Sequence, residues 1–511
     1  MIVNGENLTI EDVARVAIKG EKVELSAESI EKIKHSRNYV EKMIERGEIV
    51  YGVTTGFGKF CNVVVSREDV KKLQINLIRS HSVGVGDYFP EEVVRAMMLL
   101  RINALAKGYS GVRLSTMMTL VEMLNKGVTP LVPCQGSLGA SGDLVPLAHM
   151  VLVMLGEGEA IYEGRVLPGG RALELAGIKP LVLEAKEGLA LINGTQAMAA
   201  IGCIALVEAC NLSKAADICG ALTFEALNGI VDAFDEKIHM ARPHPGQIEC
   251  ARNMARLIGG STLVTRQGEL KVQDAYALRC IPQVHGATKD ALRHVRQVLE
   301  IEINSATDNP LIFPDEEQVI SGGNFHGQPV AINMDYMGIA VSELANISER
   351  RIERLVNPYL NEGLPAFLTK EGGLNSGLMI SQYTAAALVS ENKTLAFPAS
   401  VDSIPSSANQ EDHVSMGTIA ARKAMKIVEN TRNVLAIELL CATQAIDLRF
   451  EKMGGKGSLG KGTARAYEAV RERVAVIEED RVLSGDVKIL SELIRSGELV
   501  KRVEDRIGPL Y

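Results

Sequence analysis

The stretch best suited to chemistry spans residues 136–144, with the sequence GSLGASGDL. Its three glycines lie three residues apart, which indicates a tightly bent backbone with little side-chain bulk. The nitrogen of Gly142 can attack the carbonyl carbon of Ala140, because neither side chain blocks the approach. Loss of water closes a five-membered ring, and loss of the Ser141 hydroxyl as a second water leaves an exocyclic methylidene. The stretch can therefore make an electrophile from backbone atoms alone.

Most glycine- and serine-rich loops are only turns, and a reactive backbone is the rarer case. A phosphate-binding loop ends in Lys followed by Ser or Thr, and this stretch lacks that pair. A nucleophile elbow needs G-x-S-x-G, but here Gly142 follows Ser141 directly and Asp143 takes the last position. An inert turn therefore remains as the alternative to a backbone electrophile.

The longer segment GSLGASGDLVPLAH resembles the signature of the aromatic amino-acid ammonia-lyases. In that family an Ala-Ser-Gly tripeptide forms 4-methylideneimidazol-5-one (MIO). The resemblance thus implies MIO at Ala140, Ser141 and Gly142, with no external cofactor. Six separate segments match in the family's order and span nearly the whole chain. The resemblance further implies an ammonia-lyase/fumarase-like architecture and a homotetramer whose active sites are each built from three subunits.

A glycine-flanked loop with the sequence YGVTTGFG begins at Tyr51. Its short, β-branched pattern predicts a loop or a small strand pair, and such a loop suits a lid. A half-buried structural tyrosine is the commoner case at such a position. The resemblance implies instead that Tyr51 is the catalytic base that removes the substrate's β-proton. That role requires a pKa lowered from about 10 toward neutrality.

Two segments bear on the side chain of the substrate. In Ser80-His81, a histidine before a glycine-containing stretch is more often a cap or a structural hydrogen-bonding group. Glu411, in the segment NQED, precedes a long helical pattern and suits a helix N-terminus electrostatically. The resemblance implies that both positions recognise the substrate ring, because histidine-specific members carry Ser-His and Glu there. A site that hydrogen-bonds a polar ring rejects a ring without the partner groups.

Three polar residues at a spacing of three, Gln273, Tyr276 and Arg279, are predicted to share one face of a helix or helical turn. Such a spacing usually marks a solvated surface. The resemblance implies that all three lie at the active site, where the guanidinium fork of Arg279 binds the substrate carboxylate.

Three further residues receive binding roles from the resemblance. Asn193 would hydrogen-bond the MIO ring, Phe325 would position the substrate ring, and Met379 would line the pocket. The ordinary alternatives are a turn-forming asparagine before glycine and, for Met379, packing in the core.

Composition limits both the fold and the partners. Of the 511 residues, 46% are hydrophobic but only 4% are aromatic, so aliphatic side chains must fill the core, which favours helix packing. The net charge of −8 argues against nucleic acid as the main partner. The eight cysteines form no C-x-x-C pair and no zinc-ligand spacing, so we expect no metal site and a reducing compartment.

Helical patterns dominate the chain, which predicts a mainly α fold. We expect helices after Thr9 and at 26–46, 91–107, 112–126, 144–155, 329–356, 375–394 and 416–449, with short strands within 156–183. The longest patterns favour a helical bundle. We expect two domains: a mixed N-terminal domain with the MIO loop at 1–200, and a long-helix bundle with a helical tail at 201–511.

The N-terminal segment carries early acidic residues and no apolar signal-peptide core, and we expect no apolar run of membrane-spanning length. The sequence therefore predicts a cytoplasmic protein without membrane association.

The activity implied by the resemblance is the non-oxidative deamination of L-histidine to trans-urocanate and ammonia, the first step of histidine degradation. The same chemistry admits a 2,3-aminomutase or a phenylalanine or tyrosine ammonia-lyase. His81 and Glu411 argue against phenylalanine as substrate but do not exclude a mutase. A remote alternative is a non-catalytic helical scaffold with an inert glycine loop.

Overall fold

Capping side chains begin the first helices where the sequence predicts them. Helix α1 (Ile10–Lys19) starts at Thr9, which forms a capping box, and ends at Gly20 in the left-handed conformation with φ of 71°. Helix α2 (Ala27–Glu45) starts at Ser26, whose side chain accepts a backbone N–H of the first turn. Local sequence thus decides where these two helices begin.

The chain forms two compact units, each built from three segments. The computed structural model describes residues 1–50, 52–56, 58–60, 62–66 and 69–511. The first unit comprises Met1–Val207, Arg296–Asp335 and Pro398–Arg422, and the second comprises Glu208–Val295, Tyr336–Phe397 and Lys423–Tyr511. The first change of unit, after Val207, lies close to the boundary predicted near residue 200, whereas the later changes have no counterpart in that prediction.

The first unit packs its helices around α4, which is buried almost throughout. A helix that is apolar on every side belongs in the middle of a core. Its α-helices are α1, α2, α3 (Val70–His81), α4 (Glu91–Ala106), α5 (Leu114–Lys126), α6 (Leu144–Met154), α7 (Gly169–Leu175) and α8 (Glu187–Ile192). Two 3₁₀ turns, η1 (Gly58–Phe60) and η4 (Ser407–Asn409), also belong to this unit.

Short strands supplement the helices of the first unit. Strands β1 (Ile2–Val3) and β2 (Glu24–Leu25) pair in parallel. The remaining pairs are antiparallel: β3 (Val85–Tyr88) with β5 (Pro133–Gln135), β4 (Thr129–Pro130) with β6 (Glu159–Tyr162), β6 with β7 (Arg165–Pro168), and β8 (Leu311–Phe313) with β9 (Gln318–Ile320). The hairpin β6–β7 confirms the short strands predicted within 156–183.

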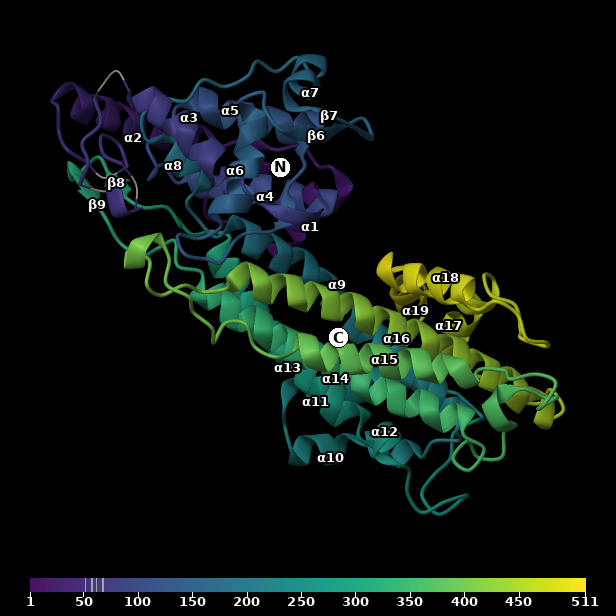
Figure 1. Ribbon diagram of the computed structural model, residues 1–511. Helices are drawn as coiled ribbons and strands as arrows, with labels where there is room; N and C mark the ends of the chain where they lie inside the picture. The colour runs from purple at the N-terminus through teal and green to yellow at the C-terminus, as the bar shows by residue number, and fades with distance from the viewer. Residues whose placement is uncertain (51, 57, 61, 67–68) are drawn as a thin grey trace. The chain divides into compact units, whose positions relative to one another are not determined.

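Four long helices contribute residues to both units: α9 (Gln196–Ala226), α13 (Ile281–Glu302), α14 (Gln328–Val356) and α16 (Gly417–Lys452). The second unit also contains η2 (Val231–Phe234), α10 (Glu236–Ala241), α11 (Pro245–Leu257), α12 (Tyr276–Arg279), η3 (Ala366–Leu368), α15 (Met379–Leu395), α17 (Lys461–Arg471), α18 (Ser484–Arg495) and α19 (Glu498–Ile507). Within this unit α14, α15 and α16 run side by side (Figure 1), joined by bonds such as that from Ser348 to Glu438 at 2.6 Å. The mainly α class and the predicted bundle are confirmed.

Two helical predictions need correction. Helix α15 begins at Met379 rather than near 375, because Gly373 and Gly377 adopt left-handed φ values of 103° and 56° and turn the chain. The predicted face shared by three polar residues does not form, since α12 spans only Tyr276–Arg279 and Gln273 lies in the non-helical segment before it.

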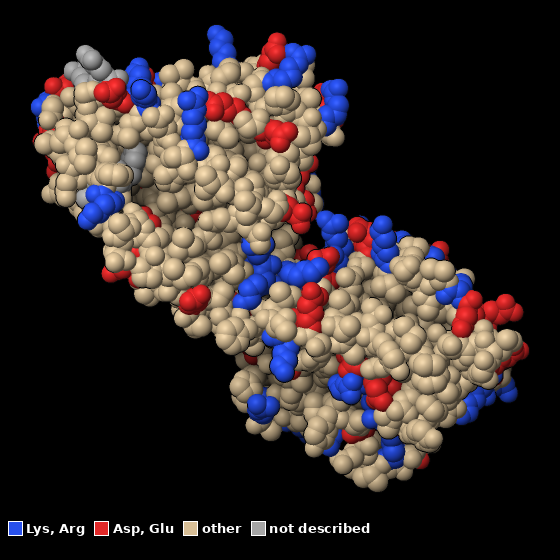
Figure 2. All heavy atoms as spheres, in the orientation of Figure 1, with Lys and Arg blue, Asp and Glu red and all other residues tan. Residues whose placement is uncertain are grey.

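The expectation that no apolar run reaches membrane-spanning length is wrong for α9. That helix is long and apolar enough to cross a membrane by length and composition, but 78% of its most apolar window is buried inside the protein. Burial of this kind is what a core helix shows. On the face drawn in Figure 2, Lys and Arg side chains are interspersed with Asp and Glu.

Candidate active site

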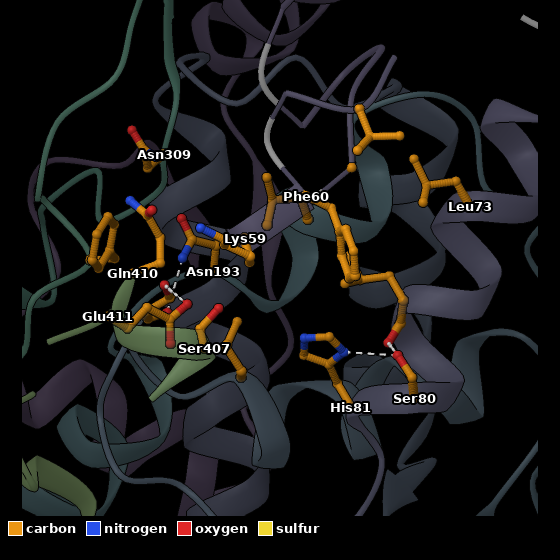
Figure 3. A pocket seen from close by; sticks show the side chains of 18 of the residues that line it. Lys59, Phe60, Leu73, Ser80, His81, Asn193, Asn309, Ser407, Gln410 and Glu411 are labelled. Carbon is orange, nitrogen blue, oxygen red and sulfur yellow. Dashed lines mark hydrogen bonds between the residues drawn. The ribbon is translucent and has the colours of Figure 1, made fainter. Parts of the chain in front are cut away.

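A cavity of about 1160 Å³ in the first unit collects residues from segments far apart in the chain. Five predicted site residues line it: His81, Ser141, Asn193, Phe325 and Glu411. Figure 3 labels three of them, His81, Asn193 and Glu411. They come from the end of α3, the glycine-rich stretch before α6, the end of α8, the loop before α14 and the segment after η4. The structure therefore brings together side chains that the sequence separates by up to 330 positions.

The backbone of the glycine-rich stretch is fixed by close contact with a second glycine turn. Gly142 forms a parallel bridge with Gly194, and the N–H of Asp143 donates to the Gly194 carbonyl at 2.7 Å. Gly142 has φ of 71°, and a Cβ atom there would lie 2.3 Å from the Gly194 oxygen. Only glycine fits this position, because both the conformation and the space exclude a side chain.

Asn193 connects the two turns through its side chain. Its Nδ2 donates to the Ser141 carbonyl oxygen at 2.9 Å, and its buried Oδ1 has no hydrogen-bond partner among the described residues. An amide donor directed at the Ser141 carbonyl suits MIO, because condensation of residues 140–142 leaves that oxygen as the carbonyl oxygen attached to the ring. The side chains present therefore fit the group that the resemblance implies.

Asp143 holds the same stretch through its carboxylate, a role that the sequence did not predict. Its carboxylate accepts from the Met198 N–H at 2.8 Å, from the Ser137 hydroxyl at 2.9 Å and from the Thr418 hydroxyl. Burial raises the pKa of the Asp143 carboxyl, and these hydrogen bonds oppose that rise. Its place directly before α6 was the only sequence signal, and it resembles an ordinary helix cap.

Glu411 lies next to Ser141 in the lining of the cavity. The Ser141 hydroxyl donates to Glu411 Oε1 at 3.4 Å, and the Ser406 hydroxyl donates to Oε2 at 3.2 Å. Residues 406 and 411 also form an antiparallel bridge. Between them Ser407, Ala408 and Asn409 all have left-handed φ values, of 50°, 53° and 66°. This tight loop, residues 406–411, fixes the direction of the carboxylate.

His81 ends α3 and faces the cavity beside Ser80 (Figure 3). The Ser80 hydroxyl and His81 Nδ1 lie 3.1 Å apart. Burial lowers the pKa of His81, while a backbone bond to Leu77 and the negative charge of Glu411 act in the opposite direction. The lowered pKa favours the neutral imidazole, in which one nitrogen is an acceptor and the other a donor.

Four predicted binding residues are not among the described residues that line the cavity. Gln273, Tyr276, Arg279 and Met379 belong to the second unit. There the Arg279 guanidinium stacks 4.7 Å from the centre of the Tyr276 ring, and Tyr276 is 71% exposed. Met379 is half-buried at the start of α15. Tyr51 lies outside the described residues.

A second polar cluster, buried in the second unit, was not predicted from the sequence. Asp217, Cys250 and His285 place their ligand atoms within 4.8 Å of one another, a grouping that could hold a metal ion. Asp217 already accepts from His285 Nδ1 at 2.8 Å, Asn253 Nδ2 at 2.9 Å and Lys289 Nζ at 3.1 Å. An ammonium group this close suits a charge network better than a cation site. Sequence spacing missed the cluster because its members come from three helices.

Solved structures define the class of the fold. The histidine ammonia-lyase of Trypanosoma cruzi matches with a TM-score of 0.91 and 44% identity, covering 99% of this chain and 95% of that chain. The tyrosine aminomutase of Streptomyces globisporus matches with a TM-score of 0.95 and 41% identity over 100% of both chains. The fold is thus that of the ammonia-lyase and aminomutase class.

The family follows from the sequence comparison. The model of the aromatic amino acid lyases matches residues 8–472, so the chain belongs to the aromatic amino acid lyase family and is a carbon–nitrogen lyase. A protein of Alkaliphilus oremlandii named histidine ammonia-lyase is 60% identical over 507 residues, which cover 99% of each chain. The resemblance drawn from the glycine-rich signature is confirmed.

Proposed function

We propose that the protein converts L-histidine to trans-urocanate and ammonia, as the first step of histidine degradation. The observation that carries this proposal is the meeting of His81, Glu411 and Ser141 in one cavity, with Glu411 3.4 Å from the Ser141 hydroxyl. The name of the Alkaliphilus oremlandii relative, at 60% identity, supports the same substrate.

The proposal includes MIO formed from Ala140, Ser141 and Gly142 with loss of two waters. The group supplies an electrophilic methylidene carbon for the substrate's amino group. The chain's own part is to hold the tripeptide bent and to bind its central carbonyl. The left-handed Gly142 and the 2.9 Å bond from Asn193 to the Ser141 oxygen support this role. An amide donor at that oxygen stabilises negative charge that develops there.

His81 and Glu411 are the proposed binding groups for the imidazole of the substrate. A carboxylate accepts from a ring N–H, and the imidazole of His81, which lines the same cavity, offers a donor or an acceptor. Phe325, which also lines the cavity, is proposed to pack against the ring. A phenyl ring would leave both polar groups without partners, which disfavours phenylalanine.

Four proposed binding residues lie in the second unit, and a neighbouring subunit is their proposed source. Tyr276 is 71% exposed, and the first helical turns of α15 expose Ile380 at 57% and Tyr383 at 59%. Exposed apolar side chains on one helix favour contact with another chain. We therefore infer a homotetramer in which Gln273, Tyr276, Arg279 and Met379 complete a neighbour's site, with Arg279 binding the carboxylate. Tyr51 remains the proposed base.

The deciding experiment is incubation of the purified protein with L-histidine, with urocanate and β-histidine both quantified. Urocanate as the main product supports the proposal, whereas β-histidine indicates a 2,3-aminomutase. Parallel incubations with L-phenylalanine and L-tyrosine test the aromatic alternatives. Borohydride should abolish activity, since it reduces the electrophile. An inert scaffold would form no product and would contain no electrophile for borohydride to reduce. Fractionation of the source cells tests the proposed cytoplasmic location.

A further inference from the structure

Arg101 is a fully buried cation beside the candidate active site, and the proposed chemistry does not use it directly. It projects from α4, has 0% exposure, and lies in the first unit with Asn193. Burial lowers its pKa to about 10, while Asp308 and Asp143 act in the opposite direction. The guanidinium therefore stays charged at neutral pH inside the core. A buried charge is expensive unless it forms specific hydrogen bonds.

The hydrogen bonds of Arg101 converge on the turn at residues 193–196. One Nη2 hydrogen bond goes to the Asn193 carbonyl at 2.7 Å, and Nη2 also donates to Gln196 Oε1. Its Nη1 donates to the Ala190 carbonyl at 3.0 Å, at the end of α8. A Cβ atom on Gly194 would lie 2.3 Å from Nη2, so the turn is closely fitted around the guanidinium.

The same turn holds the groups that contact the glycine-rich stretch. The Asn193 side chain donates to the Ser141 carbonyl, and the Gly194 carbonyl accepts from the Asp143 N–H. Gln196 extends the arrangement by donating to the Thr307 hydroxyl at 2.8 Å. The guanidinium plane is fixed because Nη2 binds two points of the turn and Nη1 binds the Ala190 carbonyl, so the turn is held at a defined position.

We propose that Arg101 is a positioning residue that holds the 193–196 turn, and through it the Asn193 amide, against the Ser141 carbonyl. The inference rests on the proposed function, because it concerns condensation of residues 140–142 and turnover at the product of that condensation. Without the guanidinium the turn keeps its sequence but loses two of its anchors. The hydrogen bond from the Asn193 amide to the Ser141 oxygen is then formed in a smaller share of the protein molecules.

The test compares Arg101→Met and Arg101→Lys with Arg95→Met as matched control. Arg95 is also on α4 and also makes three hydrogen bonds, in its case to the backbone carbonyls of Val16, Ala17 and Leu124. Each variant is digested, and the mass of the peptide containing residues 140–142 is measured by mass spectrometry. The share of this peptide that has lost two waters is the condensed fraction. Turnover of L-histidine is then expressed per condensed site, with kcat and KM measured separately.

We expect Arg101→Met to lower the condensed fraction or to lower kcat per condensed site about tenfold, with KM changed less than about twofold. Arg101→Lys should fall between Arg101→Met and the wild type, because an ammonium has no second nitrogen to bind the Ala190 carbonyl and so does not fix the orientation of the donor. Arg95→Met should match the wild type in condensed fraction and in kcat per condensed site. Loss of stability alone would reduce the yield of folded protein but not these two quantities.

The proposal is overturned if both Arg101 variants match the wild type in condensed fraction and in kcat. If Arg101→Met is insoluble, Arg101→Lys decides alone by the same two quantities. A wild-type protein with an uncondensed peptide and no urocanate would instead overturn the proposed function. A condensed and active wild type with unaffected Arg101 variants removes only the positioning role.

Discussion

The Ser141 hydroxyl and the Glu411 carboxylate lie 3.4 Å apart, although 270 positions separate them in the chain. This pair joins the residue proposed to form the electrophile to the residue proposed to recognise the imidazole. Because the two groups are this close, one histidine molecule can contact both of them. In the proposed function, the pair therefore links the chemistry of the site to its choice of substrate.

Replacing Glu411 should weaken use of histidine specifically. We expect Glu411→Gln to lower kcat/KM for L-histidine about 10- to 100-fold, because a hydrogen bond to a charged group contributes about 1.5–3 kcal/mol. Asp412→Asn, at the exposed neighbour, is the matched control and should leave kcat/KM unchanged. Steady-state assays of urocanate formation measure the difference. Equal loss in both variants would contradict the role of Glu411.

Removing the Ser141 hydroxyl should abolish catalysis without unfolding the protein. In Ser141→Ala no methylidene can form, so we expect kcat to fall by on the order of 10³-fold or more. Circular dichroism and gel filtration should match the wild type. Ser115→Ala removes an exposed hydroxyl on α5 and should keep full activity. Wild-type rates in Ser141→Ala would disprove the mechanism.

The residues at the end of α3 should determine which ring is accepted. The double variant Ser80→Phe/His81→Leu replaces two polar groups by apolar ones of the kind expected for a phenyl substrate. We expect kcat/KM for L-histidine to fall at least about 100-fold, and the ratio of phenylalanine to histidine turnover to rise. Product analysis with both amino acids measures this ratio. An unchanged ratio would show that the pair does not recognise the ring.

Glu225 should make stability depend on pH. It is buried in α9, and burial raises the pKa of its carboxyl from 4.5 to about 7, although Ser261, Thr463 and the Gly460 N–H oppose the rise. Its favourable contribution is complete below pH 4.5, where both states are protonated, and is lost as pH rises to about 7. The loss corresponds to about 3 kcal/mol.

Urea unfolding at several pH values tests this dependence. We expect Glu225→Gln to be more stable than the wild type at pH 8, and the advantage to disappear near pH 4.5, the ordinary pKa of a glutamate. Glu478→Gln, at an exposed carboxylate, is the control and should follow the wild type. A difference between Glu225→Gln and the wild type that stays constant with pH would contradict the assignment.

The buried network around Asp217 should be sensitive to loss of one charge. Asp217→Asn leaves the Lys289 ammonium without its carboxylate, and we expect a loss of about 3–5 kcal/mol in the free energy of unfolding. Glu468→Gln breaks the exposed pair with Arg465 and should cost less than about 1 kcal/mol. Urea midpoints at neutral pH compare the two. Similar small losses would show that the network is not stabilising.

Most helices were predictable because their signals are local. Thr9, Ser26 and Gly127 act within a few residues of the ends they mark, and the observed ends agree with them. The segment with Gln273 was mispredicted because a spacing of three does not itself require a helix. The non-helical chain before α12 shows that periodicity predicts a shared face only where a helix forms.

The residues of the cavity could be named from the sequence only through motifs that match a family. The residues that position them, Arg101 and Asp143, were not recognised through any such motif. Arg101 looks like one polar residue in an apolar helix, and Asp143 looks like a helix cap. Their importance depends on contacts with segments 92 and 55 positions away, which no local pattern indicates.

The loop at residues 406–411 lowers the stability of the protein while it orients Glu411, the residue proposed to discriminate among substrates. A left-handed residue other than glycine costs roughly 1–2 kcal/mol, and three stand in a row at Ser407, Ala408 and Asn409. A single-base change from alanine to glycine at Ala408 would recover part of that energy and loosen the carboxylate that follows. A single mutation could thus raise the stability of the protein and lower its proposed substrate specificity. Only selection for that specificity would keep Ala408 in place.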